Sequence, residues 1–197
     1  TKYLQIVQID NALASEAIGH KGLLGAHIAT WEPDAPKGKV HMTFSLIEKK
    51  SSTEGLGNLA IVGGERKMIE YSELSPEMAA KFEMGSPNIL IVSLDGLEDA
   101  PQLVPHIADK TATNLYGKSV PVYTFEIFVF DHKNYGAAVK LERNHVFASI
   151  KNRERTKEGK VVAESRITSQ SIQSFHHAQT LRKLGWNVPD KFTMGEK

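Results

Sequence analysis

The chain has 197 residues, of which 41% are hydrophobic and 24% charged, and it contains no cysteine. These proportions are those of an ordinary globular domain, and they exclude extended disorder, disulfide bonds, thiolate nucleophiles and cysteine-type metal sites. The net charge of +1 hides an asymmetry, because residues 1–132 sum to −6 and residues 133–197 to +7. A basic last third favours an anionic partner or association between unlike poles of two copies, although the two parts can also pair inside one fold.

The first half of the chain alternates between strand-like and helix-like patterns. Period-two or continuous apolar residues predict strands, and apolar stripes behind a capping residue predict helices. Gly63-Gly64 between two apolar runs indicates a hairpin, and Ser75-Pro76 opens a helix that Gly85 ends. The predicted strands are 3–9, 26–31, 39–48, 58–62, 66–71 and 88–94, and the predicted helices are 11–18 and 75–85.

The second half is predicted to be mostly β-structure between two helices. Those helices are 102–116 and an amphipathic last helix, 169–184, with strands at 120–130, 137–141, 146–150 and 160–167. Strict strand–helix–strand alternation is absent, which disfavours a dinucleotide-binding fold. We therefore expect an α+β fold with a mainly antiparallel sheet of about 8–10 strands, about 3–4 packed helices and an amphipathic C-terminal helix.

We expect one domain over 1–197, with 96–101 as the best place for a boundary between two. The chain opens without the apolar core of a signal peptide, and no apolar run approaches the ~20 residues that a membrane-spanning helix needs. The longest run, 120–130, is interrupted by Pro121, Thr124 and Glu126. These features, with the absence of cysteine, predict a cytoplasmic protein without a membrane span.

A basic segment in the last third is the strongest functional signal. Five of the ten residues from Lys151 to Lys160 are Lys or Arg, against two Glu. A strand–loop–strand unit over 140–166 with such a loop suits contacts to phosphates, so we expect a non-enzymatic protein that binds RNA, DNA or an acidic protein surface and forms a homo-oligomer. The alternative is a solvated polar loop. The candidate nucleic-acid-binding residues are Lys140, Arg143, Lys151, Arg153, Arg155, Lys157 and Lys160.

A second hypothesis starts from His41 and Thr43, which share one face of a predicted strand. The pattern resembles the His-x-Thr motif of the 2H phosphoesterases, which implies a phosphodiesterase that needs a second histidine, for which His145 is the best choice. The alternative is the polar outer face of an amphipathic strand. The eight histidines are scattered and no phosphate-loop or nucleophile-elbow motif occurs, so we expect no metal site and no cofactor. A structural or inhibitory interaction domain is the third possibility.

Overall fold

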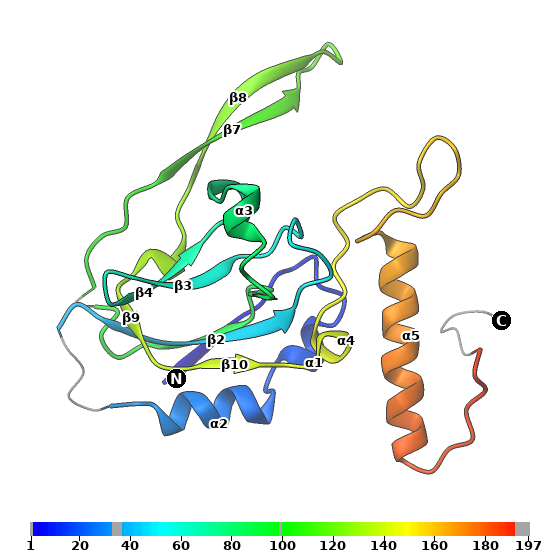
Figure 1. The fold of residues 1–197 in the computed structure, drawn as a ribbon, viewed down its shortest axis with the longest axis horizontal. Coiled ribbons are helices and arrows are strands. Elements are labelled where there is room, and N and C mark those ends of the chain that lie inside the picture. The colour runs from blue at the N-terminus through cyan, green and yellow to red at the C-terminus, as the bar shows by residue number, and fades with distance from the viewer. Residues whose placement is uncertain (1, 33–36, 99, 192–197) are drawn as a thin grey trace.

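The chain folds around a mixed, mainly antiparallel sheet (Figure 1). The computed structural model describes residues 2–32, 37–98 and 100–191. In spatial order the sheet contains β1 (Tyr3–Ile6), β6 (Leu90–Ser93), β2 (Val40–Glu48) and β10 (Ala138–Lys140), while β5 (Met84–Gly85) and β9 (Asn134–Tyr135) pair with the two ends of β2. Strands β1 and β6, β6 and β2, and β2 and β5 pair antiparallel, whereas β9 and β10 run parallel to β2.

The central strand β2 is buried on both faces. Its first six residues are all buried, although polar and apolar residues alternate along it. Met42 and Phe44 belong to one apolar cluster, while His41 and Thr43 lie on the opposite face beneath α2 (Lys21–Ala29) (Figure 1). The polar alternation therefore does not mark a solvent-facing surface, because a helix covers it.

Two antiparallel hairpins extend the fold. Strands β3 (Asn58–Val62) and β4 (Glu65–Ile69) turn at Gly63-Gly64, as predicted. Strands β7 (His106–Thr113) and β8 (Ser119–Glu126) form a long arm that projects from the body (Figure 1). The helix predicted over 102–116 is wrong. Its residues complete their backbone hydrogen bonds with β8 instead, and the β-branched threonines at 111 and 113 suit a strand.

Five helices are present in the described residues, namely α1 (Ala14–Ala17), α2, α3 (Pro76–Ala79), α4 (Arg143–Val146) and α5 (Arg166–Lys183). The last begins at a capping box, in which the Ser165 side chain accepts from the Thr168 amide and the Thr168 hydroxyl accepts from the Ser165 amide. Short 3-10 turns cover Tyr71–Glu73 and Val129–Asp131. The predicted α+β fold, with its mainly antiparallel sheet and amphipathic C-terminal helix, is confirmed.

Several predicted element boundaries are wrong for identifiable reasons. Residues 26–29 belong to helix α2 instead of a strand, and the helix ends at Ala29, because Gly22 and Gly25 are tolerated inside the helix and only Gly19, at φ +70°, breaks the chain. The helix predicted over 75–85 ends after Ala79.

The strands predicted at 146–150 and 160–167 find no neighbouring strand to pair with. Described residues of this segment make only the isolated bridges Asn11–Ser149 and Arg155–Val161. In the described part of the chain, no helix combines the length and hydropathy needed to cross a bilayer. Segment 96–101 leads from β6 toward β7, and organisation as a single domain stays a prediction.

Candidate functional site

The predicted basic site is not a single exposed patch. Lys140 lies 3.9 Å from Glu48, and Arg143 is largely buried in an ion pair with Glu54. These two pairs join the basic last third to the acidic first part, so the charge asymmetry is partly neutralised inside the fold. Lys151 lies 3.9 Å from Glu164. The remaining candidates, Arg153, Arg155, Lys157 and Lys160, are exposed on the loop.

The two histidines of the phosphodiesterase hypothesis lie in different surroundings. His41 and Thr43 are 1% and 0% exposed, which leaves no access for a phosphodiester. His145 instead lies 3.0 Å from the Gln179 side chain, on α5. Within the described ranges, no three His, Asp or Glu side chains come together as a metal site.

His41 instead forms a stacked pair with His27. The ring centroids are 4.1 Å apart and the planes differ by 10°. His27 contacts the Thr43 and Ser93 hydroxyls, each at 3.0 Å. Burial, and then the neighbouring His41, lower the pKa of His27 to about 4. Burial also lowers the pKa of His41. Both imidazoles are therefore neutral near pH 7, and they join α2 to the sheet.

Two unpartnered amide oxygens mark a different place, where β1 ends and β6 begins. The side-chain oxygens of Gln8 and Asn88 are buried and have no hydrogen-bond partner among the described residues. Ile6 pairs with Leu90 at the end of this antiparallel register, so Gln8 and Asn88 each lie two residues beyond that same end in sequence. Asn88 also adopts φ +53°, a conformation unusual outside glycine. Buried polar atoms without partners are rare in native proteins, and they indicate a place for a ligand or water.

Glu70 is related to Asn88 through two backbone pairings and one hydrogen bond. Asn58 pairs with Ile69, which sets Gly57 opposite Glu70, and Gly57 forms a bridge with Ser86. The Ser86 hydroxyl accepts from the Asn88 amide at 3.3 Å. Backbone pairing thus relates the segment that carries Glu70 to the segment that carries Asn88.

Lys151, in the last third, follows a residue that is hydrogen-bonded to the chain just after β1. Its neighbour Ile150 donates its amide to the Asp10 carbonyl at 2.9 Å, two residues beyond Gln8. Burial, followed by the nearby acidic groups of Glu73 and Glu126, raises the pKa of Glu70, and the Lys151 ammonium acts against this rise. We name Gln8, Glu70, Asn88 and Lys151 the β1-end cluster.

The cluster has the chemistry of a site for a polyhydroxylated anion. Amide oxygens accept hydrogen bonds from hydroxyl groups, and a carboxyl group can accept them or, when protonated, donate one. A lysine ammonium supplies a positive charge to a phosphate. A sugar phosphate presents both kinds of group.

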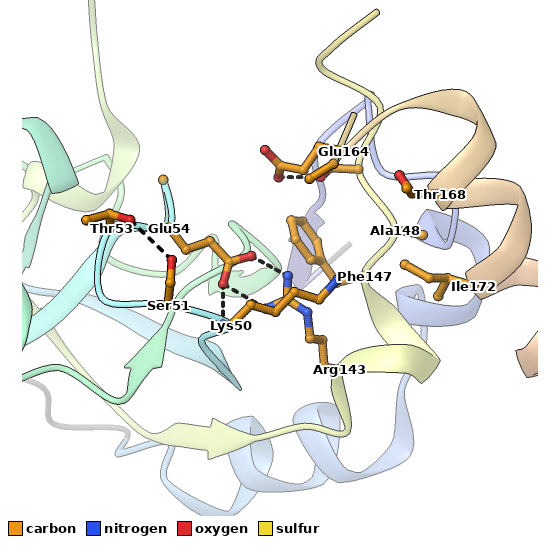
Figure 2. Close-up of a pocket in the computed structure, with 13 residues that line it drawn as sticks. Lys50, Ser51, Thr53, Glu54, Arg143, Phe147, Ala148, Glu164, Thr168 and Ile172 are labelled. Atoms are coloured by element: carbon orange, nitrogen blue, oxygen red, sulfur yellow. Dashed lines mark hydrogen bonds and ion pairs between the residues drawn. The ribbon is translucent and has the colours of Figure 1, made fainter. Parts of the chain in front are cut away.

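A cavity of about 310 Å³ lies next to Lys151. Figure 2 shows the loop residues Ser51, Thr53 and Glu54 on one side, Thr168 and Ile172 of α5 on the other, and the Phe147 ring between them. Arg143 closes one end, where both of its terminal nitrogens donate to the Glu54 carboxylate and its guanidinium carbon lies 5.3 Å from the centre of the Phe147 ring.

Glu164 connects the cavity to the cluster. It lines the cavity, and its backbone carbonyl accepts from the amides of Lys151 and Asn152 at 2.7 and 2.9 Å. Its carboxylate accepts from the Ser149 hydroxyl at 2.6 Å. The Glu164 backbone adopts φ +51°, a conformation that costs about 1–2 kcal/mol for a residue with a side chain. Any movement of Glu164 therefore changes the position of Lys151.

Comparison with solved structures shows what fold this is. No protein-family model matches the chain. The UDP-N-acetylglucosamine pyrophosphorylase from Trypanosoma brucei, solved with an inhibitor, matches with a TM-score of 0.65 at 18% identity, over 95% of this chain and 38% of that one. A structure from Entamoeba histolytica, described as the same enzyme, matches with a TM-score of 0.66 at 23% identity, over 96% and 48%. A mutant UDP-glucose pyrophosphorylase from Leishmania major gives 0.51 at 14%, over 82% and 40%.

The chain therefore has the fold of part of these pyrophosphorylases, and it spans less than half the length of the solved structures it matches. At these identities the likeness concerns the fold. The prediction of a non-enzymatic nucleic-acid-binding protein is wrong, because the structures that share the fold are enzymes of another kind. The charge asymmetry contributed to this error, because ion pairs such as Arg143–Glu54 and Lys140–Glu48 cannot be seen in a one-dimensional charge count.

Of the β1-end cluster, the sequence analysis identified only Lys151, and for a different role. Gln8, Glu70 and Asn88 were missed, since each lies inside or next to a run predicted as an ordinary strand. The sequence did contain a signal for this site, because all three are polar residues near the ends of apolar runs. Ligand sites are common where loops join a rigid sheet.

Proposed function

We propose that the chain carries the sugar-phosphate part of the active site of a nucleotidyltransferase of the UDP-sugar pyrophosphorylase type. The observation that carries this proposal is the β1-end cluster, in which Gln8 and Asn88 hold buried amide oxygens without a partner among the described residues, and Glu70 interacts electrostatically with Lys151. The shared fold with UDP-N-acetylglucosamine pyrophosphorylases over 95–96% of this chain supports it.

The proposed reaction joins UTP and a sugar 1-phosphate. An oxygen of the sugar phosphate attacks the α-phosphorus of UTP, the bond to the β-phosphate oxygen breaks, and pyrophosphate leaves with both bonding electrons. A phosphate monoester is already ionised near neutral pH, so the attacking oxygen needs no general base. Catalysis of such transfers is mostly positioning and charge stabilisation.

Each member of the cluster has a stated task in this reaction. Lys151 neutralises the sugar phosphate and reduces its repulsion from the triphosphate. Gln8 and Asn88 accept hydrogen bonds from the sugar hydroxyls, and Glu70 orients a further hydroxyl. Burial of the two amide oxygens before the ligand arrives reduces the entropy lost on binding.

An N-acetylated sugar is the favoured substrate. The two UDP-N-acetylglucosamine pyrophosphorylases match with TM-scores of 0.65 and 0.66, whereas the UDP-glucose enzyme reaches 0.51 over a smaller share of this chain. We therefore expect N-acetylglucosamine 1-phosphate to bind more tightly than glucose 1-phosphate.

The proposal is tested with Lys151→Gln and the matched control Lys157→Gln, which removes an exposed charge from the same loop. Isothermal titration with N-acetylglucosamine 1-phosphate should show at least about tenfold weaker binding for Lys151→Gln, the cost of one charge-assisted contact. Binding by Lys157→Gln should match the wild type. Equal losses of affinity in the two variants would show that Lys151 contributes no more than any other surface cation, and would contradict the proposal.

A further inference from the structure

The cavity in Figure 2 has the features of a second small-molecule site, outside the β1-end cluster. Its volume of about 310 Å³ falls at the lower end of the usual range for ligand pockets, about 300–1,000 Å³. Phe147, Ala148 and Ile172 give it an apolar floor and wall, and Lys50, Ser51 and Thr168 form a polar rim. An apolar body with one polar end fits this distribution.

The polar groups of the cavity are short of acceptors. Arg143 Nε is buried and has no hydrogen-bond partner among the described residues, although both terminal nitrogens of this guanidinium are engaged. Lys50 donates its amide to Glu54 at 2.7 Å, and its ammonium has no partner in the part of the chain that the structure describes. The acidic groups, by contrast, are occupied, Glu54 by Arg143 and Glu164 by Ser149. A ligand that completes this cavity therefore supplies oxygen acceptors.

The position of the cavity couples it to Lys151. Glu164 lines the cavity and, through its backbone carbonyl, holds the amide of Lys151. Thr168 and Ile172 line it from α5, whose first turn follows Glu164 directly. A molecule seated between loop 50–55 and α5 thus touches the residue that sets where Lys151 lies.

We propose that this cavity binds a small amphipathic carboxylate, with its carboxylate at Lys50 and Arg143 and its apolar body against Phe147 and Ile172, and that its occupation changes sugar-phosphate binding by shifting Glu164 and Lys151. The second half of this proposal rests on the proposed function, and the first half does not.

The probe for the site is 4-phenylbutanoate, with the neutral 4-phenylbutanol as its matched control compound. Saturation-transfer NMR and calorimetry should show phenylbutanoate binding to the whole chain, at least about tenfold more tightly than the alcohol, because the alcohol lacks the charge-assisted contacts. Ile172→Trp fills the cavity and should abolish binding. Phe175→Trp, on an exposed position of the same helix, should leave it unchanged. Lys50→Gln should remove most of the preference for the acid over the alcohol.

Absence of phenylbutanoate binding at millimolar concentration, or equal binding by Ile172→Trp, would overturn the site. The coupling is measured by titrating N-acetylglucosamine 1-phosphate with and without saturating phenylbutanoate, and we expect its affinity to change about fivefold or more. An unchanged affinity would overturn the coupling. Failure of the proposed function is distinguishable, because it appears as absent sugar-phosphate binding while phenylbutanoate still binds.

Discussion

At the scale of single residues, burial decides what each polar side chain does. His41 and Thr43 resemble a catalytic pair in sequence. In the structure α2 covers both, Thr43 is hydrogen-bonded to His27, and His41 is hydrogen-bonded to Ser93. Gln8 and Asn88 look unremarkable in sequence, yet their buried side-chain oxygens have no hydrogen-bond partner among the residues that the structure describes. Sequence patterns report the side-chain type, whereas only the fold reports whether a partner is already present.

The stacked histidines make stability depend on pH. The pKa of His27 is about 4 in the folded chain and ordinarily 6.5. Between pH 6.5 and pH 4, His27 is therefore protonated in the unfolded chain but neutral in the folded chain. The free energy of unfolding should therefore fall by about 1.4 kcal/mol per pH unit from pH 6.5 down to pH 4, or about 3 kcal/mol in all. The lowered pKa of His41 acts in the same direction.

Urea unfolding at several pH values in this window measures the effect. His27→Gln removes the titrating group. It should reduce the slope of the free energy of unfolding against pH by the contribution of about one proton. His145→Gln, which leaves the buried pair intact, should keep the wild-type slope. If His27→Gln kept the wild-type slope of unfolding free energy against pH, groups other than His27 would be responsible for the acid sensitivity.

At the scale of elements, the two most deeply buried strands, β2 and β6, were the most predictable from the sequence. The runs at 39–48 and 88–94 became β2 and β6, because an uninterrupted apolar or alternating run has few other ways to be buried. Only β8 of the β7–β8 arm was predicted as a strand, and the β-branched Thr111 and Thr113 were the local signal for β7 that the helix prediction over 102–116 passed over. Residues 160–167 have a strand-like composition but lack a pairing partner, and their end begins α5.

The junction between β9 and β10 depends on a single glycine. A Cβ atom on Gly136 would lie 2.1 Å from the Met42 carbonyl oxygen, and its φ of +124° is one that other residues rarely adopt. Gly136→Ala should therefore lower the free energy of unfolding by about 2–4 kcal/mol, through overpacking against β2 combined with backbone strain.

The control is Gly117→Ala in the turn of the β7–β8 arm, where φ is +74° and, chain neighbours aside, no described residue has an atom within 4 Å of the added Cβ. It should cost about 1 kcal/mol, from backbone strain alone. Chemical denaturation of both variants separates the two contributions, and equal losses would show that the contact with β2 does not matter.

At the scale of the whole molecule, distant parts of the sequence build the site together. Gln8 follows the first strand, Glu70 and Asn88 come from the middle of the chain, and Lys151 from the last third. Composition and periodicity predicted the fold class, but the proposed cluster of these four depends on pairings such as Ile6–Leu90 and Asn58–Ile69. The charge asymmetry is likewise a product of the fold, since the Arg143–Glu54 and Lys133–Glu65 pairs join the two oppositely charged parts.

The most direct test of the account follows the side-chain amides of Gln8 and Asn88 by ¹H–¹⁵N NMR during a titration with N-acetylglucosamine 1-phosphate. If the β1-end cluster binds the sugar phosphate, these two side-chain resonances and the backbone amide of Lys151 should shift together along one binding curve. The amides of Arg153 and Lys157, in the exposed loop, should move little. Shifts confined to that loop, or an unchanged spectrum at saturating sugar phosphate, would contradict the assignment of the site.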